Sequence, residues 1–533
     1  MALHSGLGTR MRFLAPIVGV VAIFAAAALS AEPLPESKEL AELLQPYLAK
    51  PLPSIETLVG VSMPPASPLM VVASLGDDAS QPDLDRGYAV GFTLNDLLFD
   101  ADPKLDVVAP WLYADDTRKK GAPRGQKRDS AANAYRAALR DHANWCAHGW
   151  VSGINPVRVE LVVDGCAAGT SSHRREWKIA SEADWPGALA EMCEFASASA
   201  TGELTSIARA SCHRARSIRP ESLLALARFG GPSENRAWKA LEAIVAADPS
   251  FAPAAIDYLW RLTYYSERRN AYWERVSVIA KGALQSSAVQ LLAYSVTANH
   301  FGWNVRYPPY PSFFYWIRNH AHLSAAWMAL ASGLARGNHE DWPQETWWTR
   351  LLPEKIATWV SLHRAPPPNE ATHTISLALS LGIYQRWPQA YRTHGQMAYA
   401  LEQYGWMLRG SGFWNEVPRI GKRGFPVFVD WSEQFYQSTL SMNPDADEAL
   451  IGLMVSTKLN GGDWLDVFDR AVEANPHNWW LYDQAMCYAR PQWRGDAETR
   501  RRIETVALEN NPDAAWAKTL RCRSESSDKS KNE

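Results

Sequence analysis

The strongest constraint on the fold is a series of Asn-Pro dipeptides near the C-terminal end of this 533-residue chain. Asn443-Pro444, Asn475-Pro476 and Asn511-Pro512 each end one apolar-periodic run and begin another, with the prolines 32 and 36 residues apart. Proline fits the first turn of a helix but cannot continue one, so each dipeptide marks a junction between helices. A period near 34 residues is typical of stacked two-helix repeats. We therefore predict an array of paired helices in this region.

The residues around these junctions agree in part with the tetratricopeptide repeat. Ala471 and Ala507 lie five residues before their prolines, where small side chains let paired helices approach closely. Trp480 and Trp516 lie four residues after them, where bulky side chains can fill the gap between pairs. Because helical character begins near residue 199, we predict an irregular tetratricopeptide-like α-solenoid over residues 199–522.

The segment from Trp406 onward resembles an uncharacterised bacterial family of tetratricopeptide-like proteins, a domain of unknown function. Residues 406–412 (WMLRGSG) and 491–495 (PQWRG) carry the resemblance, with the Asn-Pro junctions between them. The family pattern has a second glycine after the tryptophan of the latter motif, where this chain has Arg494. The resemblance implies a helical fold and no particular activity.

Before residue 199, strand-like and helical segments alternate. Residues 69–72 and 105–108 are predicted strands, and the apolar spacing of residues 84–99 predicts a helix between them. Residues 149–154 and 157–163 flank a turn-forming Asn155-Pro156, as in a β-hairpin. We therefore predict a small α/β domain over residues 56–198, which places the whole chain in the α+β class.

The order of these elements is similar to that of the amino-terminal domain of TolB and its relatives. The matching stretches include Gly87-Tyr88, residues 149–153 (GWVSG) and residues 157–164 (VRVELVVD). The resemblance implies a small α/β interaction module, and that domain brings no catalytic residues with it.

The N-terminal residues have the form of a secretory signal peptide. Arg10 and Arg12 precede an apolar run at residues 13–29, and residues 28–31 (ALSA) place small side chains where a signal peptidase reads. We predict a signal peptide at residues 1–30, a leader at 31–55, and a periplasmic or secreted protein without a transmembrane span in the mature chain. The alternative is an uncleaved inner-membrane anchor at residues 13–29, with the rest of the chain in the periplasm.

The six cysteines are even in number and fall into neighbouring pairs, which suits an oxidising compartment. Six cysteines allow 15 connectivities, and the alternative is a set of free buried thiols. Local structure favours three bonds between neighbours: Cys146–Cys166, Cys193–Cys212 and Cys487–Cys522. At the end of the chain, residues 523–533 contain no apolar side chain, so we predict a disordered tail.

Tryptophan is concentrated in the helical region, where 19 of the 24 lie. Residues 303–359 hold seven of them together with Glu340, Asp341 and Glu345, which suggests the hypothesis of a glycan-binding groove with catalytic carboxylates. Packing between irregular helices explains the same excess more simply. The candidate binding residues are Trp342, Trp347, Trp348, Arg409, Trp414 and Trp493.

Charge and motifs exclude several classes of function. Lys and Arg number 54 against 57 Asp and Glu, a formal net charge of −3, so we expect no nucleic-acid partner. The mature region holds no His-Glu-x-x-His, nucleophile elbow or phosphate loop, so we predict no metal, cofactor or catalytic residue. The predicted function is an exported scaffold or adaptor that binds a protein or peptide. The alternative is an envelope protein that binds or processes glycans.

Overall fold

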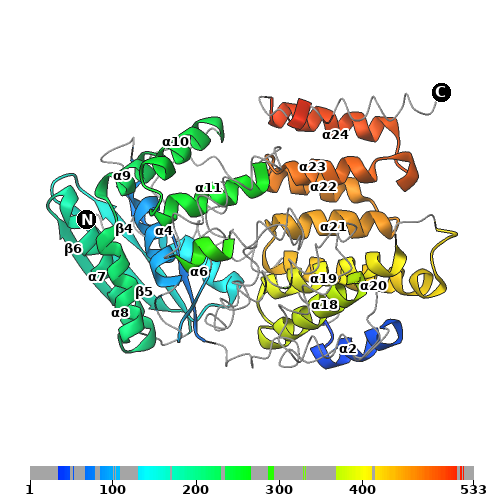
Figure 1. Ribbon diagram of the computed structural model, residues 1–533, viewed down its shortest axis with the longest axis horizontal. Helices are drawn as coiled ribbons and strands as arrows, with labels where there is room; N and C mark the ends of the chain where they lie inside the picture. The colour runs from blue at the N-terminus through cyan, green and yellow to red at the C-terminus, as the bar shows by residue number, and fades with distance from the viewer. Residues whose placement is uncertain are drawn as a thin grey trace, which may run out of the picture.

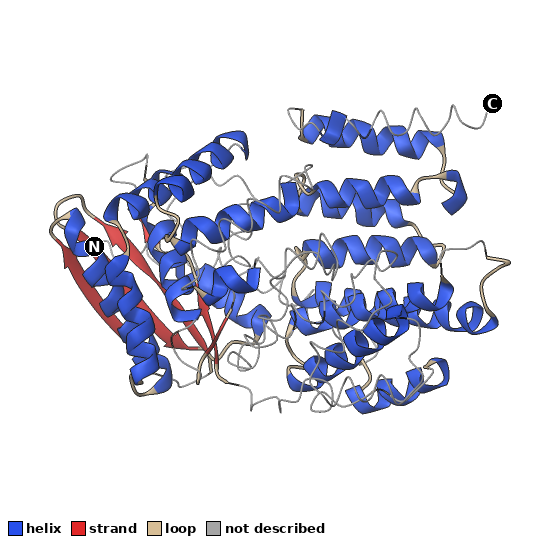
Figure 2. Ribbon diagram, in the orientation of Figure 1, coloured by secondary structure: helices blue, strands red, loops and turns tan. Residues whose placement is uncertain are grey.

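The structure is a computed structural model of the whole chain. It describes residues 34–48, 52, 67–78, 84–99, 101, 104–108, 130–167, 171–229, 234–265, 286–292, 328, 331, 368–410, 414–512, 516–518 and 520. In these residues the fold is mostly helical with a small mixed sheet, which is consistent with the predicted α+β class. Figure 2 shows the strands together at one end of the molecule.

Within the described residues, the sheet has six strands in the order β3-β1-β4-β5-β6, with β2 also paired to β4. The pairs β1–β3, β1–β4 and β2–β4 are parallel, whereas β4–β5 and β5–β6 are antiparallel. The predicted hairpin is present, and its first strand begins earlier than expected. The strands are β1 (Leu69–Val72), β2 (Gly76–Asp77), β3 (Asp106–Val107), β4 (Trp145–Ser152), β5 (Val157–Gly165) and β6 (Ser172–Ile179).

Helices cover both faces of this sheet. Alternate side chains of a strand point to opposite faces, and Met70 and Val72 of β1 join the cluster on the α4 side while Val71 and Ala73 join the cluster on the α6 side. The elements in this half are α4 (Arg86–Phe99), α6 (Ser130–Asp141), η2 (Glu182–Asp184), α7 (Trp185–Thr201), α8 (Ser206–His213), η3 (Arg214–Ser217), α9 (Pro220–Phe229), α10 (Glu234–Ala247) and α11 (Ala252–Tyr265).

Helix α4 lies at the centre of this half of the molecule, between the sheet and the helices that follow it (Figure 1). Every one of its residues is buried. Its two glycines lie against the chain that leaves β1: a Cβ at Gly87 would be 2.1 Å from the Leu75 carbonyl oxygen, and one at Gly91 would be 2.8 Å from that of Ala73. The missing side chains therefore let the helix approach the backbone closely.

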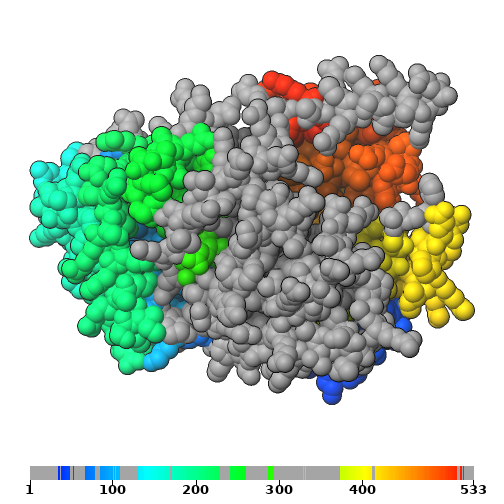
Figure 3. Space-filling view, viewed as in Figure 1, coloured from blue at the N-terminus to red at the C-terminus, as the bar shows by residue number. Residues whose placement is uncertain are grey.

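The second half is a stack of helices that runs up the right side of Figure 1, from α18 at the bottom to α24 at the top. Figure 3 shows the C-terminal helices at the end of the molecule opposite the sheet. The elements are α18 (Pro368–Arg386), α19 (Tyr391–Arg409), α20 (Arg419–Met442), α21 (Asp447–Leu459), α22 (Trp464–Ala474), α23 (Trp479–Tyr488), η4 (Pro491–Trp493) and α24 (Ala497–Asn510).

The Asn-Pro dipeptides lie at helix junctions, as predicted. Asn443, Asn475 and Asn511 are the C-cap residues of α20, α22 and α24, and all three are buried. Asn475 donates from Nδ2 to Asp447 Oδ2 at 2.5 Å, and Asn511 donates from Nδ2 to the Pro476 carbonyl at 2.9 Å. Each of these two asparagines thus connects its own helix junction to the preceding one. This contact explains why asparagine precedes the proline at both junctions.

The predicted leader includes an ordered part of the helical stack. Helix α2 (Ser37–Leu44) and the following turn η1 (Gln45–Tyr47) pack against the C-terminal helices, with Leu40 and Leu44 fully buried in the same cluster as Phe428. The Tyr384 hydroxyl also donates to the Pro35 carbonyl at 3.2 Å. The sequence interpretation missed this role because a short amphipathic helix shows its partner only in the folded chain.

The predicted domain boundary at residue 198 falls inside α7. One hydrophobic cluster continues across it, from Met70 in the sheet through Leu189 and Leu226 to Leu292 and Ile383. A second cluster holds α2 together with α19–α24. The helices up to α11 therefore share their core with the sheet, since α4 needs them to cover its outer side.

Helix α6 links the sheet to the helical stack. Asp141 at its C-terminal end, 3% exposed, accepts a hydrogen bond at Oδ2 from Arg392 Nη2 of α19 at 3.4 Å, and its Oδ1 lies 3.3 Å from Arg392 Nε. The preceding Arg140 donates from Nη1 to Asn443 Oδ1 at 3.3 Å, at the first of the three Asn-Pro junctions. These contacts join the two halves through charged groups that are largely removed from water.

We expect Gly91→Ala to lower the free energy of unfolding by about 1–3 kcal/mol, because the added methyl group meets backbone atoms that cannot give way. The loss would appear as a lower midpoint of urea denaturation. Gly187→Ala in α7 is the matched control, since nothing lies within 4 Å of its Cβ position. A helical alanine there should raise stability by about 0.5–1 kcal/mol. Equal midpoints for the two variants would contradict this account of α4.

Asp141→Ala should lower the free energy of unfolding by about 3 kcal/mol, because it leaves the Arg392 guanidinium without its carboxylate in a place with little water. Asp469→Ala removes a comparable ion pair with Arg502 in which both side chains are about half exposed. That control should change stability by less than about 1 kcal/mol. Denaturation monitored by tryptophan fluorescence measures both, and a similar small loss for each variant would remove α6 as a structural link.

Candidate functional site

Three of the six predicted binding residues belong to the described part of the chain: Arg409, Trp414 and Trp493. The other three, Trp342, Trp347 and Trp348, lie outside the described residues, as do the carboxylates at positions 340, 341 and 345. The described candidate residues therefore all belong to the C-terminal helical stack.

The structure brings Arg409 and Trp493 together, although 84 positions separate them in the sequence. The guanidinium carbon of Arg409 lies 5.3 Å from the ring centroid of Trp406 and 5.4 Å from that of Trp493. The two indoles meet edge to face, with centroids 5.6 Å apart. Phe425 of α20 completes this set of side chains, which we call the Arg409 cluster. A guanidinium over aromatic faces is a favourable cation–π arrangement.

Local backbone geometry places Arg409 in its cluster. Helix α19 ends at Arg409, and Gly410 adopts a positive φ of 70° while donating its N–H to the Trp406 carbonyl at 2.9 Å. Arg409 itself donates from Nη1 to the Gly410 carbonyl at 2.8 Å. Gly410 therefore ends the helix, and Arg409 helps to shape the helix end.

The second motif of the family resemblance, residues 491–495, supplies Trp493 to the cluster. Pro491 begins the short turn η4, and Trp493 packs on Tyr488 as well as on Trp406. Arg494 adopts a left-handed φ of 56°, a conformation that favours glycine, which is the residue expected there. Gly495 lies directly on the backbone of Ala489, where a Cβ would be 2.1 Å from the carbonyl oxygen.

Trp414 lies apart from these packed side chains. It begins the turn between α19 and α20 and is 49% exposed, and Ile420 in the first turn of α20 is 45% exposed. We call these two residues and the turn between them the α19–α20 turn. In Figure 1 it projects from the end of the stack that is farthest from the sheet. The same projection is visible at the edge of the space-filling view in Figure 3.

The α19–α20 turn is held firmly at its base. A Cβ at Gly421 would be 2.2 Å from the Leu408 carbonyl oxygen, so the start of α20 lies directly on the end of α19. Lys422 donates from Nζ to the Asn415 carbonyl at 3.1 Å, which ties the turn to the helix that follows it. Trp414 is therefore presented to solvent on ordered backbone.

Sequence reasoning missed a polar cluster on the sheet face that carries α6. The Asp164 carboxylate accepts hydrogen bonds at Oδ2 from the Tyr135 hydroxyl at 2.7 Å and from His148 Nε2 at 2.8 Å. Burial acts to raise the pKa of Asp164, but hydrogen bonds from Ser172, Tyr135 and His148 outweigh it and bring the pKa below its ordinary value. The hydrogen bond to Asp164 also raises the pKa of Tyr135. Because side chains alternate between the two faces of a strand, the hairpin register places His148 and Asp164 on the same face of the sheet. That alternation was the signal in the sequence that could have revealed the pair.

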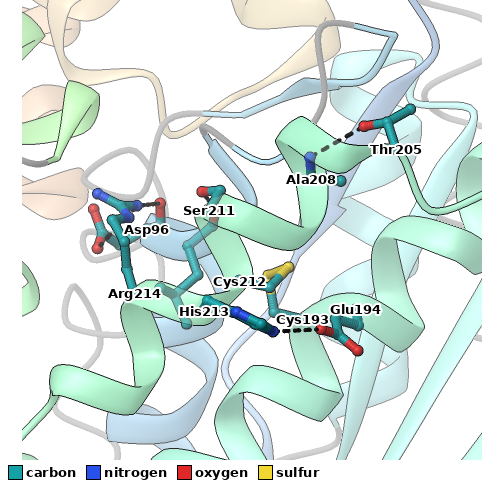
Figure 4. Close-up of a disulfide and its surroundings, with 10 residues drawn as sticks. Asp96, Cys193, Glu194, Thr205, Ala208, Ser211, Cys212, His213 and Arg214 are labelled. Carbon is teal, nitrogen blue, oxygen red and sulfur yellow. Dashed lines mark hydrogen bonds and ion pairs between the residues drawn. A yellow bond between two sulfur atoms is a disulfide. The ribbon is translucent and has the colours of Figure 1, made fainter.

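One predicted disulfide is formed, between Cys193 of α7 and Cys212 of α8. Their Cα atoms are 5.4 Å apart, and the residues are 19 positions apart in the sequence. In the chain-entropy account, a loop of this size contributes about 3 kcal/mol. Figure 4 shows the bond beside the pair formed by Glu194 and His213, whose side chains also connect the two helices.

Of the other two predicted disulfides, Cys146–Cys166 is not formed in the structure, and Cys487–Cys522 includes a residue outside the described part of the chain. Cys146 and Cys166 are free thiols that lie diagonally across the β4–β5 pair, since Cys146 is opposite Asp164 and the Cys166 N–H bonds the Asn144 carbonyl. Cys487 is also a free thiol, and its predicted partner Cys522 lies outside the described residues. The hairpin brings Cys146 and Cys166 close together, as expected. The two thiols form a hydrogen bond instead of the predicted disulfide.

Among the residues that the structure describes, no group of three or more His, Cys, Asp or Glu could hold a metal ion. Likewise, no described helix combines the length and apolar character that a membrane crossing requires.

Comparison with known proteins identifies no family. No protein-family model matches the sequence, and no curated protein gives a significant match. Among solved structures, the fold is similar to the human IFIT1 dimer with m7Gppp-AAAA, at 12% sequence identity and a TM-score of 0.36. The similarity covers 56% of this chain and 60% of that chain. A score this low carries no argument about fold or function, so the conclusions below rest on the geometry of this chain.

Proposed function

We propose that this protein is an exported, non-catalytic scaffold whose tetratricopeptide-like helical stack binds a protein or peptide partner. The observation that carries the proposal is the exposure of Trp414 on the ordered α19–α20 turn. Tryptophan is enriched among the residues that dominate binding energy at protein interfaces. A half-exposed indole on a projecting turn can enter a pocket on a partner with little rearrangement of the backbone.

Pre-organisation supports this role for the α19–α20 turn. Binding costs conformational freedom, and a surface that is already ordered loses less of it. The Arg409 cluster holds the end of α19 against η4, while Gly421 seats α20 on Leu408. Arg409 and Trp493 therefore serve as supports for the surface, whereas Trp414 is the contact residue. This division refines the prediction that all three bind directly.

Export is supported by the disulfide and by the N-terminal sequence. Cys193 and Cys212 are bonded, and structural disulfides persist in oxidising compartments. The predicted signal peptide at residues 1–30 lies outside the described residues, as does the alternative anchor at 13–29. We place the bulk of the chain in the periplasm or outside the cell under either alternative.

The proposed scaffold joins an α/β module to the helical stack. The contact between α6 and the Arg392–Asn443 region keeps the sheet at a set position relative to the stack. A partner bound at the α19–α20 turn would therefore be held at a defined distance from the sheet. The near-neutral charge of the chain agrees with a protein or peptide partner and gives no general attraction for nucleic acid.

A photoreactive amino acid at position 414 should crosslink a partner in the native envelope, which mass spectrometry then identifies. With that partner purified, Trp414→Ala should weaken its binding by about 30-fold or more, the loss typical of an interface residue worth about 2 kcal/mol. Isothermal titration calorimetry measures the affinity, and an unchanged melting temperature would show that the fold is intact.

Ile207→Ala is the matched control, because Ile207 is 56% exposed on α8 and belongs to a different surface. Its affinity for the same partner should equal that of the unsubstituted protein. The proposal fails if Trp414→Ala binds as tightly as this control. It fails also if the protein shows saturable glycan binding and no protein partner, the outcome expected of the alternative centred on Trp342, Trp347 and Trp348.

A further inference from the structure

The sheet carries two cysteines whose surroundings differ sharply from those of the bonded pair. Cys146 in β4 is fully buried, whereas Cys166, just after β5, is partly exposed at the edge of the α6-side cluster. Their thiols are close enough to hydrogen-bond. Because the residues sit diagonally on neighbouring strands, both side chains are on the same face of the sheet.

The bonded pair in the same chain provides an internal comparison. Cys193 and Cys212 are both fully buried between α7 and α8, so an external thiol has no access to either sulfur. In the Cys146 pair, Cys166 is partly exposed whereas Cys146 is fully buried. Labile and regulatory disulfides are typically the exposed ones, and access governs the rate of exchange.

We propose that Cys146 and Cys166 form a reversible dithiol–disulfide site that exchanges with small-molecule disulfides, with Cys166 as the entry point and Cys146 as the resolving thiol. This site is distinct from the α19–α20 turn and does not depend on the binding function proposed above.

The reaction is ordinary thiol–disulfide exchange, and its atoms and electrons balance. The Cys166 thiolate attacks one sulfur of the small disulfide, the external S–S bond breaks, and one thiolate leaves and takes a proton from water. Cys146 then attacks the Cys166 sulfur, losing its own proton, and the second external thiolate leaves and takes up that proton. Two electrons pass from the two protein thiols to the external disulfide, which is reduced to two thiols.

The polar neighbours suit this order of events. The hydrogen bond from Cys146 stabilises the Cys166 thiolate and lowers the pKa of Cys166, and the same hydrogen bond with burial raises that of Cys146. Cys166 therefore ionises first, at the more accessible position. The negative charge of the Asp164 carboxylate raises the pKa of both thiols. The hydrogen bonds that Asp164 accepts from Tyr135 and His148 partly offset this charge.

The experiment equilibrates the full-length protein, without denaturant, in buffers of varied reduced-to-oxidised glutathione ratio. After acid quenching and alkylation, peptide mapping by mass spectrometry measures each disulfide. We expect the Cys146–Cys166 bond to form and disappear as the ratio changes, while Cys193–Cys212 remains bonded throughout. A Cys146–Cys166 bond that resists reduction as fully as Cys193–Cys212 would overturn the proposal, and so would a bond that never forms.

Two variants assign the roles of the sulfurs. Cys146→Ala keeps a small apolar side chain in the core and removes the resolving thiol, so the mixed disulfide between Cys166 and glutathione should accumulate. Cys166→Ser should abolish reaction at Cys146.

Cys487→Ser is the control, because Cys487 is a half-buried free thiol on α23, and it should leave exchange at the Cys146 pair unchanged. If Cys146 reacts with glutathione equally well in Cys166→Ser, Cys166 is not the entry point and the proposal is wrong.

Discussion

The close approach of α4 to the chain that leaves β1 is the constraint on which the rest of the structure depends. A helix whose residues are all buried needs packing partners on every side, and one sheet face can cover only part of it. Gly87 and Gly91 bring the helix onto the backbone, and α7, α8, α9 and α11 cover what remains. Polar contacts also hold these layers: the Ser211 hydroxyl donates to the Leu97 carbonyl at 3.1 Å, and Ser286 donates to Asp96 Oδ1 at 2.6 Å.

The C-terminal stack is held in register by a different device. Its junction asparagines are buried, and a buried amide that lacks partners is costly, so each must find hydrogen bonds nearby. Asn475 and Asn511 find them at the preceding junction, and Asn443 finds one at Arg140 of α6. The series of junctions thus extends to the sheet domain. This arrangement gives the α19–α20 turn, at the far end of the same helices, a rigid base.

Local pattern predicted a good part of these features. The Asn-Pro spacing located the helix junctions, the turn residues located the β4–β5 hairpin, and nearness in sequence paired Cys193 with Cys212. Each of these rests on interactions within a few residues or one repeat. The Arg409 cluster is different, because its members come from α19, α20 and η4, and nothing local connects Trp406 to Trp493. The Tyr135–Asp164–His148 cluster was missed because Tyr135 comes from α6, and only the fold brings that helix onto the β4–β5 pair.

The sequence by itself determined the helix junctions at the Asn-Pro dipeptides and the turn of the β4–β5 hairpin, because proline and apolar spacing act on the backbone within a few residues. Tertiary structure alone decided that the α2 segment belongs to the C-terminal helices and that the core of the sheet continues past residue 198. It also decided that Trp414 is exposed while Trp406 and Trp493 pack on Arg409. These outcomes depend on which surfaces meet, and segments far apart in the chain must fold together before their side chains can select one another.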